Sequence, residues 1–239
     1  MTSTNDGAVG FQQLPGRTVD RSATYEMMLR DLLSLVGAEA PGLDEGRRFW
    51  RARARRAVSL AVAVRVEQAS EAGPVPDEWY EPLIRAAVHE PDPSFVRDLV
   101  QPAVSAFGRR RVRLGLLAHL ENGPTPDAAG AARAWYWTMV PLRYLAGART
   151  PTAESIEEQA RYHDLDRRYA DTALRRFVAD DDLDLRRCIL PGLNLTPEAY
   201  PADLRPLAAR AVEIARSSHD DYLRHRVEIQ TRLTPSSTE

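Results

Sequence analysis

The stretch DPSFVRDLVQPAVSAFG, residues 92–108, has the form of one unit of a helical repeat. A turn that contains Asp92 leads into a helix with the pair Val96-Arg97, followed by small and apolar residues, and Gly108 closes it. Pro102 falls inside that helix and predicts a kink, because the proline ring removes one backbone hydrogen bond. The stretch predicts one helix that must bury its apolar side against a neighbour.

Weaker copies of this pattern follow along the chain. In each, an acidic residue leads to an arginine: Asp127 to Arg133, Asp181 to Arg186, and Asp221 to Arg226. Counted from Arg97, the four arginines are 36, 53 and 40 residues apart. Two of these intervals match a two-helix repeat of about 40 residues. The longest interval accommodates a long helix predicted over residues 152–178.

Hydrophobic periodicity predicts helices through most of the remaining chain, and no segment shows the sustained alternation of a strand. The expected helices cover 22–36, 44–72, 77–90, 94–107, 109–120, 126–146 (kinked at Pro141), 152–178, 183–190, 204–216 and 220–233. The fold class is therefore predicted to be all-α. Residues 1–21 are predicted to be a flexible arm, 22–233 a single domain and 234–239 a disordered tail. Within the domain, 22–72 would cap a stack of repeats formed by 77–233.

The repeat pattern resembles the HEAT-like helical-repeat family, most closely over residues 92–108 and more loosely over 77–233. The resemblance implies stacked antiparallel helix pairs that form an α-solenoid. It also implies a structural ladder between neighbouring repeats, made here by Asp92, Arg97, Arg133, Arg186 and Arg226. Such a ladder has a physical basis, since a guanidinium group can satisfy carboxylates and helix-end carbonyls of the next unit.

Composition removes several classes of chemistry. All 32 basic residues among the 239 are arginine, so no lysine is present to form a Schiff base or to bind a nucleotide phosphate in a phosphate loop. A single cysteine, Cys188, excludes an intrachain disulfide framework and a metal site built from several cysteines. The sequence has no nucleophile elbow, dinucleotide-binding glycine motif or metal-binding histidine pair. It favours a non-catalytic protein without a metal or cofactor.

The charge balance and the termini bear on location. The formal net charge is −2, whereas a dedicated nucleic-acid binder is usually basic. The N-terminus lacks a secretory signal pattern, and no apolar stretch approaches the roughly 20 residues of a membrane span. These features predict a cytoplasmic protein that does not enter a membrane.

Two clusters of arginine are the first candidate binding residues: Arg48, Arg51 and Arg55 in one, and Arg109, Arg110, Arg111 and Arg113 in the other. Guanidinium groups suit phosphate and stack on bases, so the clusters could form a face for nucleic acid or a phosphorylated ligand. The alternative is that they lie on solvated helix faces and pair with acidic residues such as Glu90 and Asp98.

Trp135 and Trp137 are the second candidates. Residues two apart on a helix point about 200° apart, so the two indoles are not expected to face the same neighbour. One of them could line an inner surface and stack a base or anchor a peptide. The alternative is that each packs into a different adjacent helix.

These features lead to one principal hypothesis and two alternatives. The principal one is a non-catalytic helical-repeat scaffold that binds another protein on its concave face. The first alternative is a nucleic-acid-binding protein related to HEAT-like DNA glycosylases that act on alkylated purines, although no aspartate here matches the catalytic one of that family. The second is a regulatory or oligomeric accessory protein whose partner is encoded nearby. Independently of these hypotheses, the helix over 22–36 suits either a cap on the stack or a dimerisation helix.

Overall fold

The computed structural model describes residues 19–42, 46–145, 147 and 149–232. These residues form helices and no strand, with one isolated bridge between Tyr144 and Pro151. The prediction of an all-α fold is confirmed for this part of the chain. The predicted arm and tail fall largely outside it, apart from residues 19–21.

The helices follow one another with short connections. In order they are α1 (Val19–Leu35), α2 (Arg47–Glu67), α3 (Ala69–Ala72), α4 (Tyr80–His89), α5 (Arg97–Phe107), α6 (Arg109–Asn122), α7 (Thr125–Tyr136), α8 (Ala153–Ala160), α9 (His163–Ala179), α10 (Leu183–Ile189), α11 (Arg205–Ser217) and α12 (Asp221–Arg232). Single 3₁₀ turns lie at Asp77–Trp79, Pro93–Phe95, Leu190–Gly192 and Pro197–Ala199.

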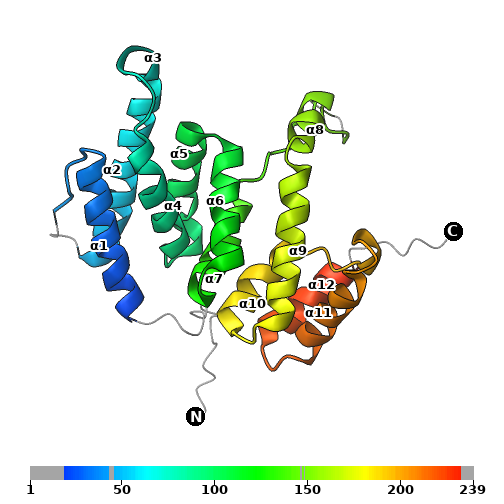
Figure 1. The fold of residues 1–239 in the computed structure, drawn as a ribbon. Coiled ribbons are helices and arrows are strands. Elements are labelled where there is room, and N and C mark those ends of the chain that lie inside the picture. Colours follow the sequence, from blue (N-terminus) through cyan, green and yellow to red (C-terminus); the bar gives the residue numbers. More distant parts are fainter. Residues whose placement is uncertain (1–18, 43–45, 146, 148, 233–239) are drawn as a thin grey trace, which may run out of the picture.

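Consecutive helices pack against each other along much of the chain (Figure 1). The pairs α1 and α2, α4 and α5, α6 and α7, and α11 and α12 are in contact, while α7 also packs on α4 and α10. One continuous cluster of buried apolar side chains runs from Tyr25 in α1 to Val227 in α12. The α3 end of α2 and the short helix α8 project beyond this packed body (Figure 1).

The contact between α7 and α4 depends on a residue without a side chain. Gly130 lies in the middle of α7, and a Cβ atom there would overlap the backbone carbonyl oxygen of Val88 in α4. The neighbouring Ala128, Ala129 and Ala131 are also buried. This run of small residues allows the two helices to approach closely.

Two expected helix boundaries at the N-terminal side are wrong. Helix α1 begins at Val19 rather than Ser22, and nothing among residues 19–21 is a glycine or proline that would stop it. The single helix expected over 44–72 is divided, since α2 ends at Glu67 and Gln68 separates it from α3. Residue 44 lies outside the described residues.

The helix expected to continue through Pro141 to residue 146 ends at Tyr136 instead. No described residue between Tyr136 and Ala153 is helical, so Pro141 lies in the connection to α8 rather than at a kink within a helix. By contrast, Pro102 lies inside α5 as expected.

The long helix expected over 152–178 is divided into α8 and α9. Tyr162 leaves helical geometry, with φ −119° and ψ 6°, and its ring packs on the core with the Arg113 guanidinium carbon 5.1 Å from the ring centre. Neither glycine nor proline lies at this break, which coincides with the packing of the Tyr162 ring.

Among the described helices, none combines the length and the apolar composition needed to cross a lipid bilayer.

Candidate functional site

The first arginine cluster includes a buried ion pair. Arg55 donates from Nη1 to Glu90 Oε2 at 2.9 Å, and both side chains are almost fully buried. Tyr25 donates its hydroxyl to the same carboxylate, and the Asp92 backbone N–H donates to Glu90 Oε1 at 2.9 Å. Burial raises the pKa of Glu90 above its ordinary value, with the Arg55 charge and the Tyr25 hydroxyl opposing that shift. Arg55 is therefore part of the interior of the protein and not of an open binding face.

The other members of this cluster give little support to a basic face. Arg51 lies half-buried on α2, and Arg53 donates to the Gly42 carbonyl oxygen at 2.7 Å. The side chain of Arg48 lies outside the described set.

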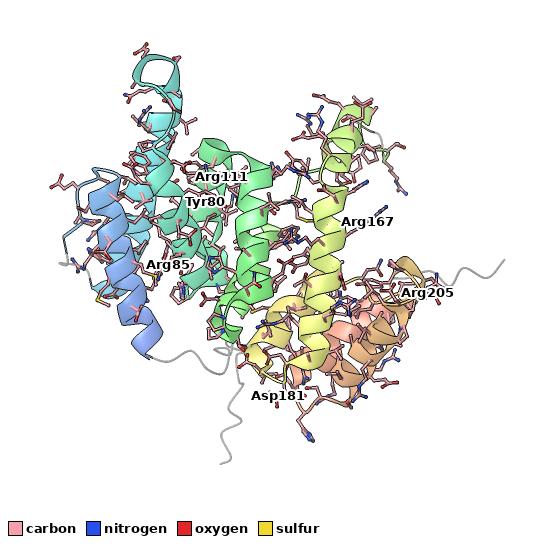
Figure 2. All side chains as sticks on the ribbon, viewed as in Figure 1. Tyr80, Arg85, Arg111, Arg167, Asp181 and Arg205 are labelled. Atoms are coloured by element: carbon pink, nitrogen blue, oxygen red, sulfur yellow. The ribbon has the colours of Figure 1, made fainter. Side chains whose placement is uncertain are left out.

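The second cluster, at the start of α6, is also occupied by contacts within the chain. Arg109 donates to the carbonyl oxygens of Thr138 and Met139, Arg110 pairs with Asp164, and Arg111 pairs with Asp77. Arg111 also lies over the Tyr80 ring, 4.1 Å from its centre, and Figure 2 shows the two residues together. These contacts agree with the alternative drawn from the sequence, in which the arginines pair with acidic groups of the same chain instead of forming a binding face.

Arg113 is the most deeply buried arginine of the second cluster, with a side chain 2% exposed. Its Nη1 donates to Asp166 Oδ1 at 2.9 Å, and its Nε donates to Thr138 Oγ1 at 3.1 Å. Its guanidinium carbon lies 4.8 Å from the Trp135 ring centre, and Trp135 stacks in parallel on Tyr169 at 4.4 Å. Burial lowers the pKa of Arg113 and raises that of Tyr169. Arg113 therefore supports one aromatic wall rather than facing solvent.

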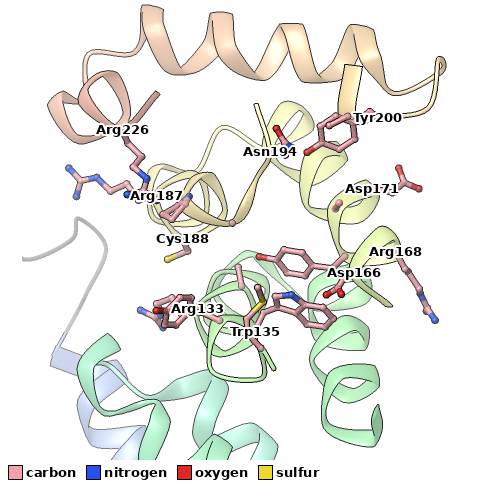
Figure 3. A pocket seen from close by; sticks show the side chains of 18 of the residues that line it. Arg133, Trp135, Asp166, Arg168, Asp171, Arg187, Cys188, Asn194, Tyr200 and Arg226 are labelled. Atoms are coloured by element: carbon pink, nitrogen blue, oxygen red, sulfur yellow. The ribbon is translucent and has the colours of Figure 1, made fainter. Parts of the chain in front are cut away.

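That wall belongs to a cavity of about 1720 Å³ between the C-terminal end of α7, the middle of α9, the end of α10 and the start of α12. We call it the α7–α12 cavity. Its lining includes aromatic rings from Trp135, Trp137, Tyr169 and Tyr200. Figure 3 shows Arg133, Arg187 and Arg226 toward one side of it and Tyr200, Asp171 and Arg168 toward the other.

Both predicted tryptophans line this cavity, but they contact different neighbours, as expected: Trp135 stacks on Tyr169 of α9, and Trp137 lies near Arg97 of α5. The cavity surrounds the C-terminal end of α7, so two side chains that leave the helix in different directions both reach its lining. Trp135 is nearly buried, while Trp137 is half-buried and meets Tyr136 edge-on at 5.1 Å.

Aspartates and arginines line the cavity in equal number, five of each. The aspartates are all paired with arginine: Asp166 with Arg113, Asp171 and Asp203 with Arg175, Asp220 with Arg187, and Asp221 with Arg224. Of these partners only Arg187 is itself a lining residue, and Arg168 pairs with Glu121 outside the lining. Within the described part of the chain, no ion pair joins Arg133, Arg167 or Arg226 to a carboxylate. The lining therefore carries positive charge that no carboxylate among the described residues neutralises.

Two of these arginines have side-chain nitrogen atoms that are buried and have no hydrogen-bond acceptor among the described residues. Arg133 Nε and Nη1 and Arg226 Nε are shielded from solvent, and the described residues offer them no hydrogen-bond acceptor. Both side chains are half-buried, and a partly desolvated guanidinium group without a counter-charge attracts an anion more strongly than a fully exposed one does.

The five residues assigned to a structural ladder take different roles. Asp92 accepts a hydrogen bond from the Ser94 backbone N–H at 3.0 Å and so caps the turn before α5. Arg97 is exposed, with its guanidinium carbon 5.9 Å from the Trp137 ring centre. Arg186 donates to the Phe177 carbonyl oxygen at 3.2 Å, which is the helix-end contact that a ladder requires. Arg133 and Arg226 instead line the cavity.

The far side of the cavity is aromatic and partly polar. Burial raises the pKa of Tyr200 to about 12. Tyr200 therefore carries its proton at neutral pH and acts as an uncharged group. Cys188 also lines the cavity and lies 3.9 Å from the Asp184 carboxylate.

The cavity residues that the sequence did not single out are mainly Tyr169, Tyr200, Arg187 and Asp220. Each comes from a different position along the last 75 residues, so spacing alone did not connect them. Among the described residues, no group of three or more histidine, cysteine, aspartate or glutamate side chains is arranged to hold a metal ion. Comparison with protein families, with characterised proteins and with solved structures found no match to this chain.

Proposed function

We propose that this protein is a non-catalytic binding module that takes a segment of another protein into the α7–α12 cavity. The observation that carries this proposal is the cavity itself, which combines aromatic walls with polar groups and a volume of about 1720 Å³. Pockets for small ligands usually measure about 300 to 1000 Å³. The larger space suits several consecutive residues of a peptide.

The aromatic lining supports the same proposal. Trp, Tyr and Arg are the residue types enriched at the energetic centres of protein interfaces, and all three occur in this lining. Trp135 is held rigidly between Tyr169 and Arg113, so binding would not cost it conformational freedom. A HEAT-like stack of helix pairs is the arrangement we propose for the chain, with this cavity on its inner side.

The test is selection from a displayed library of random 12-residue peptides. We expect the wild-type chain to select peptides, and an Ala199→Trp variant to lose them, because Ala199 is exposed at the cavity lining and an indole there would occupy the space. Ala202→Trp is the matched control, since Ala202 is exposed three residues further on and is not a lining residue. If the library yields no binder, or if Ala199→Trp selects the same peptides as the wild type, the proposal is wrong.

Nucleic acid remains the alternative partner, and the contacts of Arg109, Arg110 and Arg111 within the chain weigh against it. A gel shift on generic duplex DNA at low salt tests it directly, because phosphate contacts are strongest there. Binding that survives Ala199→Trp but is lost on changing these three arginines to alanine would replace the peptide proposal.

A further inference from the structure

The balance of charge in the α7–α12 cavity indicates which kind of peptide it takes. Every aspartate of the lining has an arginine partner, and most of those partners come from outside the lining. Arg133 and Arg226 have no carboxylate partner among the described residues. The unneutralised groups of the cavity are therefore cationic.

From this balance we infer that the occupant is an acidic peptide segment, with a carboxylate placed against Arg133 and Arg226. This inference rests on the proposed function, because it specifies the ligand of the same cavity. Figure 3 shows both arginines on the same side, apart from the Tyr200 end. The aromatic residues Trp135, Trp137 and Tyr200 would then receive apolar side chains of the same segment.

Local contacts explain why these two arginines need an external anion. Asp220 is one of the lining carboxylates, and it already accepts hydrogen bonds from Arg187 Nε at 3.1 Å and from the Leu223 backbone N–H at 3.0 Å. These bonds outweigh the opposing effect of burial and hold the pKa of Asp220 below its ordinary value. Asp220 is therefore ionised and occupied by other donors.

The same wall disfavours a nucleic-acid strand. A strand carries one negative charge per nucleotide, whereas only Arg133, Arg167 and Arg226 in the lining lack a carboxylate partner among the described residues. A peptide carries its carboxylates on separate side chains and can place one at the arginine side while apolar groups fill the rest.

Four chains are compared in the peptide selection: the wild type, Arg133→Gln/Arg226→Gln, the control Arg210→Gln, and Ala199→Trp. Arg210 is exposed on α11, pairs with Glu213 and does not line the cavity. We expect Asp and Glu to be enriched in peptides selected by the wild type and by Arg210→Gln. The double variant should lose that enrichment and keep the preference for apolar and aromatic residues. Matching far-ultraviolet circular dichroism and thermal unfolding would show that all four chains are folded.

A second measurement links the arginines to the carboxylate. One selected peptide, and the same peptide with Gln in place of its Glu residues, are titrated by fluorescence anisotropy into the wild type and the double variant. A charged hydrogen bond contributes about 1.5 to 3 kcal/mol, so we expect the Glu-to-Gln change to weaken binding to the wild type about tenfold or more. The double variant should bind both peptides nearly equally, and the wild-type affinity should fall as salt is raised.

The outcomes separate this inference from the proposed function. Peptides selected without acidic residues, or an equal effect of the Glu-to-Gln change on both chains, would overturn the acidic ligand and leave the cavity as a peptide site. Selection that Ala199→Trp does not change would overturn both.

Discussion

Replacing Glu90 with alanine should destabilise the protein more than any surface substitution. Glu90 is fully buried and accepts hydrogen bonds from Tyr25, Arg55 and the Asp92 backbone. The alanine variant leaves Arg55 charged, 3% exposed and with only Asp98 as a distant acidic neighbour at 3.9 Å. Removing one partner of a buried ion pair costs about 3 to 5 kcal/mol.

Urea unfolding followed by circular dichroism measures this loss. With a denaturant dependence of about 3 kcal/mol per M, a loss of 3 to 5 kcal/mol lowers the unfolding midpoint by about 1 to 1.7 M. The surface variant Arg210→Ala, which removes an exposed pair with Glu213, should change the free energy of unfolding by about 1 kcal/mol or less.

A double variant separates the charge from the volume of the removed group. Arg55→Met/Glu90→Leu takes away both charges and fills the space with apolar groups, so it should recover more than half of the stability lost in Glu90→Ala. A midpoint shift below about 0.3 M for Glu90→Ala would show that the buried charge is solvated or paired elsewhere, and the reasoning would fail. A double variant as unstable as Glu90→Ala would show that shape, and not charge, determines the effect.

Three further predictions concern the packing of the helices. Gly130→Ala should lower the free energy of unfolding by about 1 to 3 kcal/mol in urea titrations, despite the higher helix propensity of alanine, because the new methyl group overlaps the α4 backbone. Asp220→Asn should be less stable than the wild type at neutral pH, because it loses the ion pair with Arg187. The pKa of Asp220 in the folded protein lies below its ordinary value of 3.8, and protonation removes the contribution of this pair. The urea midpoints of the variant and the wild type should therefore converge as the pH falls below about 4. Arg97→Ala should reduce the free energy of unfolding by only about 0.5 to 1 kcal/mol, the scale of an exposed contact with the Trp137 ring; a loss of 3 kcal/mol would instead support the ladder role.

The sequence predicted the features that local chemistry determines. Gly108, with φ 81°, separates α5 from α6 as expected, and the Asp182 side chain caps α10 by accepting the Leu185 N–H at 2.8 Å. Glycine and aspartate act through their own backbone conformation or their immediate neighbours, so one sequence is sufficient to place them.

The breaks at Gln68 and Tyr162 could not be placed in this way. Both residues are compatible with a helix, and the chain leaves helical geometry there without a glycine or proline. At Tyr162 the break coincides with the packing of its ring beside Arg113, which lies 49 residues earlier in the sequence. A tertiary contact of this kind leaves no local signal.

The arginines show how local sequence and tertiary structure together define the candidate site. Arg55, Arg113, Arg133 and Arg226 all lack an acidic residue three or four positions away, so none can form a pair along its own helix. In the folded protein, Arg55 pairs with Glu90 and Arg113 pairs with Asp166, and each carboxylate comes from another part of the chain. It brings Arg133 and Arg226 to the wall of a cavity whose carboxylates are already paired. These two arginines therefore differ from Arg55 and Arg113 in having no carboxylate partner among the described residues, and in our proposal a carboxylate of the bound peptide supplies that partner.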